Sequence, residues 1–116
     1  MSQALAKFQT QVVDQTAKIT QFREELGEDP SHALKWGNSA FEAAARLSVA
    51  KMLVYCFTDR PGQPAQSVES VRKMLLGKVT QRSKYPPQST SPTSNLMEQY
   101  ELAALAEAYE ELAYLG

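Results

Sequence analysis

The sequence predicts an all-α protein, a four-helix bundle with a central, largely buried second helix. In four separate segments, apolar residues recur at spacings of three and four, the period of an α-helix that packs on one side. No segment shows the alternation of a half-buried strand, and connections are short apart from a long Pro/Ser-rich loop at 83–94. We therefore expect residues 1–116 to form a single helical domain in which 83–94 is a flexible loop.

The first predicted helix covers residues 2–26 and carries a seam of apolar residues like that of a coiled coil. Gln15 is the one polar residue in this seam, and Gly27 is expected to end the helix. The seam is expected to pack inside the chain's own bundle or against a second copy of the chain. A possible homo-oligomer would use its apolar members, which are Leu5, Phe8, Val12, Ile19, Phe22 and Leu26.

The central helix is predicted over residues 38–57, with Asn38 or Ser39 as its cap. Small residues fill its first half and larger apolar residues its second half, so it has no wide polar face. We expect the three other helices to cover it and Cys56 to be a buried thiol.

Residues 30–37 form either a short separate helix or an extension into the central one. Asp29 is placed to cap this segment, with Pro30 at the first helical position. Gly37 and Asn38 favour a break before the central helix.

The last two helices are predicted from their caps and apolar spacing. Ser67 is expected to cap a helix that ends near residue 80, with Val68, Val71 and Leu75 on its apolar side. Ser94 or Asn95 is expected to cap a final helix that ends near residue 115.

Composition excludes several kinds of chemistry. The net charge of −1 gives no global bias toward nucleic acid or an anionic membrane. One His and one Cys cannot build a structural zinc site within one chain, and the glycines are too scattered for a phosphate-binding loop. We therefore expect no catalysis, cofactor or metal. With no signal-peptide pattern and no long apolar run, we also expect a cytoplasmic protein without a membrane partner.

Charge is segregated along the second half of the chain. Residues 60–85 carry six basic residues against one glutamate, whereas 86–116 carry five glutamates and no basic residue. The two segments either pack side by side or present patches to a partner. The basic patch, which would suit a nucleic acid, comprises Arg72, Lys73, Lys78, Arg82 and Lys84.

The final helix carries the aromatic side chains that we expect to be exposed, Tyr100 and Tyr114. Both project toward an acidic side formed by Glu107, Glu110 and Glu111. Aromatic anchors with a charged rim are typical of protein interfaces. We favour another protein as the partner, and a role as an adaptor, a regulator or a small accessory or inhibitor protein.

The stretch His32-Ala33-Leu34-Lys35-Trp36-Gly37 resembles the motif of histidine phosphotransfer domains. These are four-helix bundles in which a phosphorylatable His is followed by x-Leu-Lys-Gly and small residues. Trp36 stands where that family has glycine. The resemblance implies an alternative function in which His32 carries a phosphoryl group.

Overall fold

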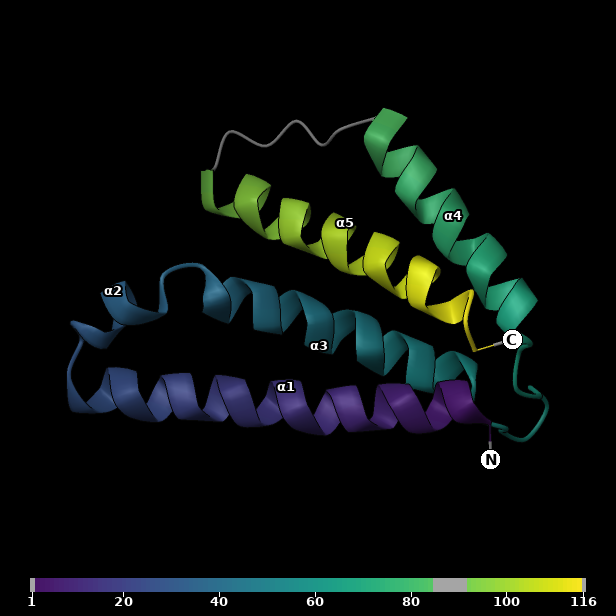
Figure 1. The fold of residues 1–116 in the computed structure, drawn as a ribbon, viewed down its shortest axis with the longest axis horizontal. Coiled ribbons are helices and arrows are strands. Elements are labelled where there is room, and N and C mark those ends of the chain that lie inside the picture. Colours follow the sequence, from purple (N-terminus) through teal and green to yellow (C-terminus); the bar gives the residue numbers. More distant parts are fainter. Residues whose placement is uncertain (1, 85–91, 116) are drawn as a thin grey trace.

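The described part of the chain folds into four long helices and one short helix, an all-α bundle. The computed structural model describes residues 2–84 and 92–115. The elements run α1 (Gln3–Glu28), α2 (His32–Trp36), α3 (Ser39–Cys56), α4 (Val68–Lys84) and α5 (Pro92–Leu112). α3 lies between α1 and α5, α4 lies on the far side of α5, and both chain ends lie at the same end of the molecule (Figure 1).

α1 and α3 are antiparallel neighbours along most of their length (Figure 1). Ser2 caps α1, because its hydroxyl accepts the N–H of Leu5 at 3.1 Å. The N-terminal part of the α1 seam is used inside the chain: Phe8 is 1% exposed and stacks on Phe57 with ring centroids 6.5 Å apart, and Leu5 and Val12 pack against the same core.

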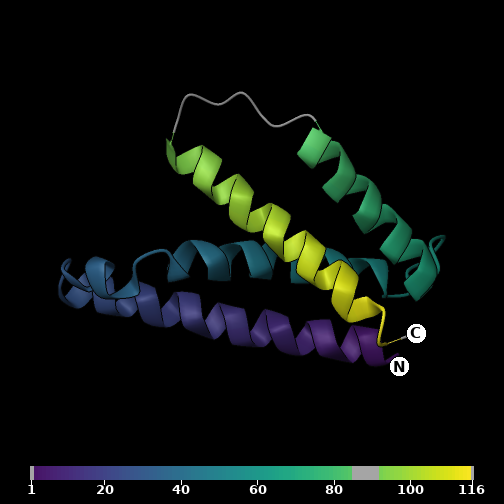
Figure 2. The same cartoon turned by 45° about the horizontal axis from the view of Figure 1, so that its top comes forward.

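The central helix is largely buried, as the sequence predicts, but two long helices provide most of its cover. α5 crosses α3 at an angle and its C-terminal end reaches the N-terminal half of α1 (Figure 2), whereas α4 packs mainly against α5. α4 reaches the common core through Val71 and Leu75 at its N-terminal half. α4 therefore contributes less to the cover of α3 than the sequence predicts, and Tyr55 of α3 stays 58% exposed.

α2 is a separate turn of helix, which answers the question left open for residues 30–37. Gly37 ends it with a positive φ of 54°, a conformation that residues with a Cβ rarely adopt. Asp29 does not cap α2; its carboxylate accepts the N–H of Ser31 at 3.0 Å, and this hydrogen bond lowers the pKa of Asp29. Asn38 takes the cap position of α3 without a side-chain hydrogen bond.

The remaining boundaries correct the predictions by a few residues. α1 runs through Gly27 to Glu28, and α4 continues to Lys84, so the predicted loop does not begin at residue 83. The Ser67 hydroxyl accepts the N–H of Ser70, as expected of a cap. α5 begins at Pro92, before both predicted caps, because proline suits the first helical position. The rest of the predicted loop, 85–91, lies outside the described residues.

Within the described ranges, no helix combines the length and the apolar character that a membrane crossing requires.

Candidate functional site

The acidic residues predicted to face a partner are partly engaged inside the chain. Glu107 accepts from Arg46 of α3 at 3.4 Å, and Glu111 lies 3.9 Å from the Lys7 ammonium and 3.3 Å from the Gln11 amide of α1. These carboxylates therefore flank the packing of α5 on α1 and α3 and do not form a free acidic side. Glu110 remains exposed.

The two tyrosines have different environments. Tyr100 is half-buried and packs against the hydrophobic core, so the expectation of an exposed anchor is wrong for this residue. Tyr114 follows the end of α5 and is 89% exposed. The structure therefore separates the two residues that the sequence grouped as aromatic anchors.

The basic patch is divided in the same way. The Arg82 guanidinium lies 3.0 Å from the Glu101 carboxylate, and that of Arg72 lies over the Tyr109 ring, 4.4 Å from its centroid. Both contacts join α4 to α5, so the segregated charges serve the packing of two neighbouring helices. Lys73 and Lys84 are exposed and Lys78 is half-buried.

His32 is the first residue of α2 and belongs to a contact with α1. Its Nδ1 lies 2.7 Å from the backbone oxygen of Glu25, a geometry in which a protonated Nδ1 donates to that oxygen. The single thiol, Cys56, is buried, and burial raises its pKa. Among the described residues, no group of three or more His, Cys, Asp or Glu side chains is arranged to hold a metal ion.

A shallow groove of about 330 Å³ runs between α3 and α5 and is called the α3–α5 groove below. Its α3 side carries Phe41, Ala44, Ala45 and Ser48, and its α5 side carries Met97, Glu98 and Glu101. Met97 is 47% exposed. The groove therefore combines an apolar floor of mostly small residues with carboxylates along one wall.

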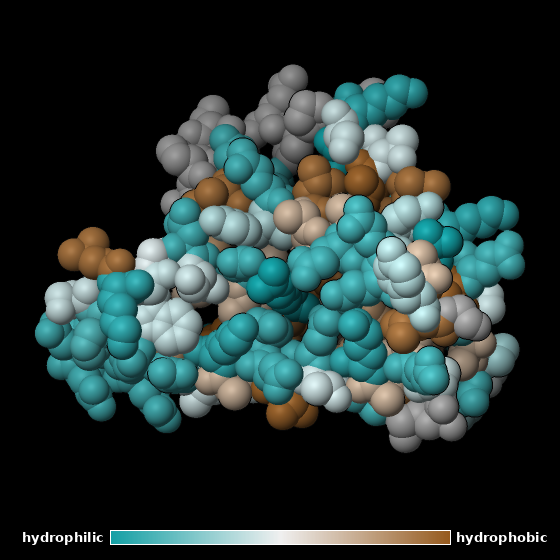
Figure 3. Space-filling view, viewed as in Figure 1, coloured by the Kyte–Doolittle hydropathy of each residue, from teal (hydrophilic) through white to brown (hydrophobic). Residues whose placement is uncertain are grey.

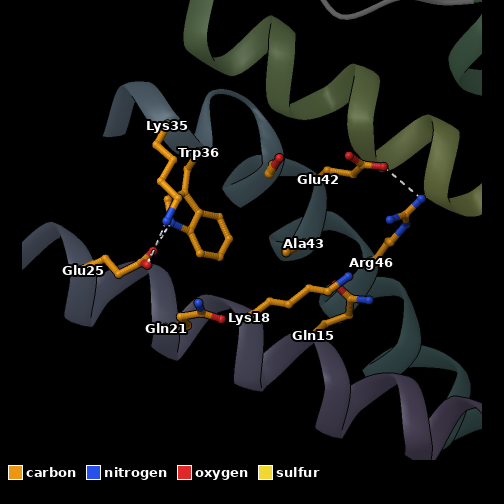
Figure 4. A pocket seen from close by; sticks show the side chains of 10 residues that line it. Gln15, Lys18, Gln21, Glu25, Lys35, Trp36, Glu42, Ala43 and Arg46 are labelled. Atoms are coloured by element: carbon orange, nitrogen blue, oxygen red, sulfur yellow. Dashed lines mark hydrogen bonds and ion pairs between the residues drawn. The ribbon is translucent and has the colours of Figure 1, made fainter. Parts of the chain in front are cut away.

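A larger pocket of about 390 Å³ lies where α1, α2 and α3 meet and is called the Gln15 pocket. The face viewed in Figure 3 is mostly hydrophilic over α1 and is hollowed beside α2. Close up, Trp36 stands at one end of the pocket, Ala43 forms part of its wall, and Gln15 and Lys18 extend along it from α1 (Figure 4). Its other lining residues are Gln21, Glu25, Lys35, Ser39, Glu42 and Arg46.

Two ion-paired clusters hold the ends of this pocket. At one end, the Glu25 carboxylate accepts from the indole N–H of Trp36 and from Lys35 at 3.3 Å, which fixes α2 against α1. The hydrogen bond from Trp36 is the main cause of the lowered pKa of Glu25, and Lys35 adds to it. At the other end, Arg46 pairs with Glu42 at 2.9 Å (Figure 4).

Gln15 is the unusual member of the lining. Its side chain is buried, with the residue only 8% exposed, and its Oε1 has no hydrogen-bond partner among the described residues. A buried polar atom is nearly always satisfied in a folded protein, because leaving it unpaired costs about 1–3 kcal/mol. A residue that lines the pocket thus carries a buried acceptor without a partner in the described part of the chain.

The sequence signalled this residue but not its surroundings. Gln15 is the single polar member of the α1 seam, and the small Ala43 lines the same pocket on α3. The contact between Glu25 and Trp36 and the exposed Tyr55, whose ring lies under the Arg60 guanidinium, were not predicted. Their partners lie on different segments, so helical spacing could not bring them together.

No protein-family model, curated protein sequence or solved structure matches this chain.

Proposed function

We propose that this chain is a non-enzymatic interaction module that binds a protein partner by accepting a basic amphipathic helix in the α3–α5 groove. The observation that carries the proposal is the composition of the groove, in which apolar and small side chains form the floor and carboxylates form one wall. A helix in a groove is a recurring mode of peptide recognition, in which apolar anchors at helical spacing enter the groove.

The spacing of the floor suits such a partner. Phe41, Ala44, Ala45 and Ser48 recur at three and four on α3, and the small side chains allow a helix backbone to approach closely. Met97 adds a flexible apolar surface from α5, a type of side chain that adapts to different partners.

Charge complementarity favours a basic partner. α5 carries five glutamates and no basic residue. Glu98 makes no ion pair within the described part of the chain, while Glu101 shares its carboxylate with Arg82. Lys or Arg beside the apolar anchors of the partner helix would lie against this wall and set its orientation.

The environments of His32 and Cys56, the single histidine and the single cysteine of the chain, support a non-enzymatic function. His32 is engaged with the backbone of Glu25, and Cys56 is buried with a raised pKa, so it is mostly protonated near neutral pH. The phosphotransfer alternative needs an accessible His, and it would be discarded if a phosphorylated response regulator left no label on the chain, or if the label survived His32→Ala.

The proposal is tested by selecting peptides from a displayed library of amphipathic helices and measuring their affinity for the wild type. Selected peptides should carry apolar residues at helical spacing together with Lys or Arg. Met97→Lys should weaken their binding about tenfold or more by removing an apolar contact and repelling the basic side chains.

Val13→Lys is the matched control, because Val13 is 67% exposed on α1 and lies outside the groove. Equal loss in both variants, or no loss in Met97→Lys, would contradict the proposal. A duplex DNA gel shift abolished by neutralising Lys78, Arg82 and Lys84 would replace it with nucleic-acid binding. Light scattering that detects a dimer sensitive to Ile19→Lys would favour a second copy on the α1 seam instead.

A further inference from the structure

The Gln15 pocket is distinct from the α3–α5 groove, and its lining calls for a small ligand. It lies on the α1 side of α3, with a volume in the range of small-molecule sites. The α1 seam would ordinarily be filled by an apolar side chain at position 15. Here the seam holds an amide instead, opposite the small side chain of Ala43.

The unpaired Gln15 Oε1 defines the first requirement on a ligand. This oxygen is buried, while the Gln15 side chain lines the pocket. A turn of the amide toward the opening would let a ligand donate an N–H or O–H to an atom that has no partner among the described residues. The amide end of Gln15 lies inside the pocket beside the end of the Lys18 side chain (Figure 4).

The charges of the lining define the second requirement. Glu25 is engaged by Lys35 and Trp36, and Arg46 is shared between Glu42 and Glu107, so each carboxylate of the lining has a cation beside it. Lys18 makes no ion pair within the described part of the chain, which leaves one uncompensated cation beside the buried amide. A single carboxylate on the ligand would give Lys18 an ion-pair partner.

The third requirement comes from the apolar part of the lining. The Trp36 ring lies along one end of the pocket and Ala43 forms part of its wall (Figure 4). An aromatic ring on the ligand would pack against the indole, as aromatic pairs do at offset or edge-to-face geometry.

We propose that the Gln15 pocket binds a small aromatic carboxylate with an N–H donor beside its carboxyl group, as in an N-acylated aromatic amino acid. The carboxylate pairs with Lys18, the N–H donates to Gln15 Oε1, and the ring packs against Trp36. The same chemistry occurs in a free small acid and at the C-terminus of a polypeptide that ends in an aromatic residue.

The test uses N-acetyl-phenylalanine as the probe and the fluorescence of Trp36, the one tryptophan of the chain, as the readout. Saturable quenching with a dissociation constant of about 1 mM or below is expected for a ligand of this size. Two matched probes remove one group each: 3-phenylpropionate lacks the N–H, and N-acetyl-phenylalanine amide lacks the carboxylate. Each should bind about tenfold more weakly.

Variants of the protein separate this site from nonspecific binding. Gln15→Leu and Lys18→Gln should each weaken binding of the probe about tenfold, while Gln9→Leu on the exposed side of α1 and Lys73→Gln on α4 should leave it unchanged. Calorimetry on the same variants checks the fluorescence result. No saturable binding at millimolar concentration, or equal binding to Gln15→Leu and Lys18→Gln, would overturn the proposal and leave ordered water as the partner of Gln15.

A further measurement distinguishes the two sources of the ligand. Binding of Gly-Gly-Gly-Phe as tightly as the small acid would assign the pocket to polypeptide C-termini, and binding of the small acid alone would assign it to a free metabolite. Both results support the site. Because neither probe contains an amphipathic helix, failure here leaves the α3–α5 groove untouched, and Met97→Lys should not alter binding of the probe.

Discussion

The two halves of the α1–α3 interface are made by the same pair of helices but are packed differently. Toward the N-terminus of α1, Phe8 and Ala4 meet Val49, Ala50 and Leu53 in a dry core in which these residues are at most 5% exposed. Toward its C-terminus, Gln15 replaces the apolar seam residue and a polar pocket opens.

The difference follows from which side chains the two helices supply. In the apolar half, large side chains of α1 meet large and small ones of α3, so they fill the space between the helices. In the polar half, Ala43 supplies little volume, and the ion pairs at Glu25 and Arg46 hold the two ends of the opening. Stability is therefore concentrated in one half, while the other half has room for a ligand.

The largest effect is expected in the apolar half. Leu53 is fully buried, so Leu53→Ala should lower the free energy of unfolding by about 2–5 kcal/mol through lost contacts and a residual cavity. Chemical denaturation measures this loss, and the dependence of the free energy of unfolding on denaturant concentration should have the same slope in the wild type and the variant. The control is Leu34→Ala, since Leu34 is 87% exposed and its truncation should change stability by at most about 0.5 kcal/mol. Similar losses in both variants would contradict the placement of the core.

In the polar half, a substitution is expected to raise the free energy of unfolding instead of lowering it. Gln15→Leu removes an unpaired buried acceptor and restores the apolar seam, so the free energy of unfolding should rise by about 1–3 kcal/mol. The same denaturation experiment measures it, with Gln9→Leu as the exposed control on α1. A clear destabilisation by Gln15→Leu would show that the amide has a partner, and the contrast between the halves would fail.

A smaller effect on stability is expected from the protonation of Glu25, at the end of the Gln15 pocket beside α2. Because the pKa of Glu25 is lowered in the folded chain, the folded state binds fewer protons than the unfolded state as glutamates titrate. The stabilisation is thus fully present above the ordinary glutamate pKa and is lost as pH falls through the lowered value. Asp29, whose pKa is also lowered, titrates in the neighbouring acid range.

We expect Trp36 fluorescence to report this step as α2 loosens from α1 during acid titration, before the core unfolds. Glu25→Gln should remove most of the acid-dependent change in Trp36 emission, whereas Glu24→Gln, one position away and exposed, should retain it. An identical titration curve in Glu25→Gln would show that this carboxylate does not hold the indole.

The sequence by itself determined the helices, because each carries its own periodic apolar side and local signals. Ser67 caps α4 as expected, Gly37 separates α2 from α3, and Cys56 is buried as predicted. The sequence also marked Gln15 as the single polar residue of the α1 seam. Such features depend on residues within a few positions of one another, whose geometry the helix fixes.

Only the tertiary structure decided which sides meet. Periodicity shows that Tyr100 shares a side of α5 with Glu107, but not that this side lies against α1 and α3. Composition shows that α4 is basic, but not that Arg72 and Arg82 contact α5. The Gln15 pocket likewise needs three helices at once, because the partners of Glu25 and Gln15 depend on how separate segments dock.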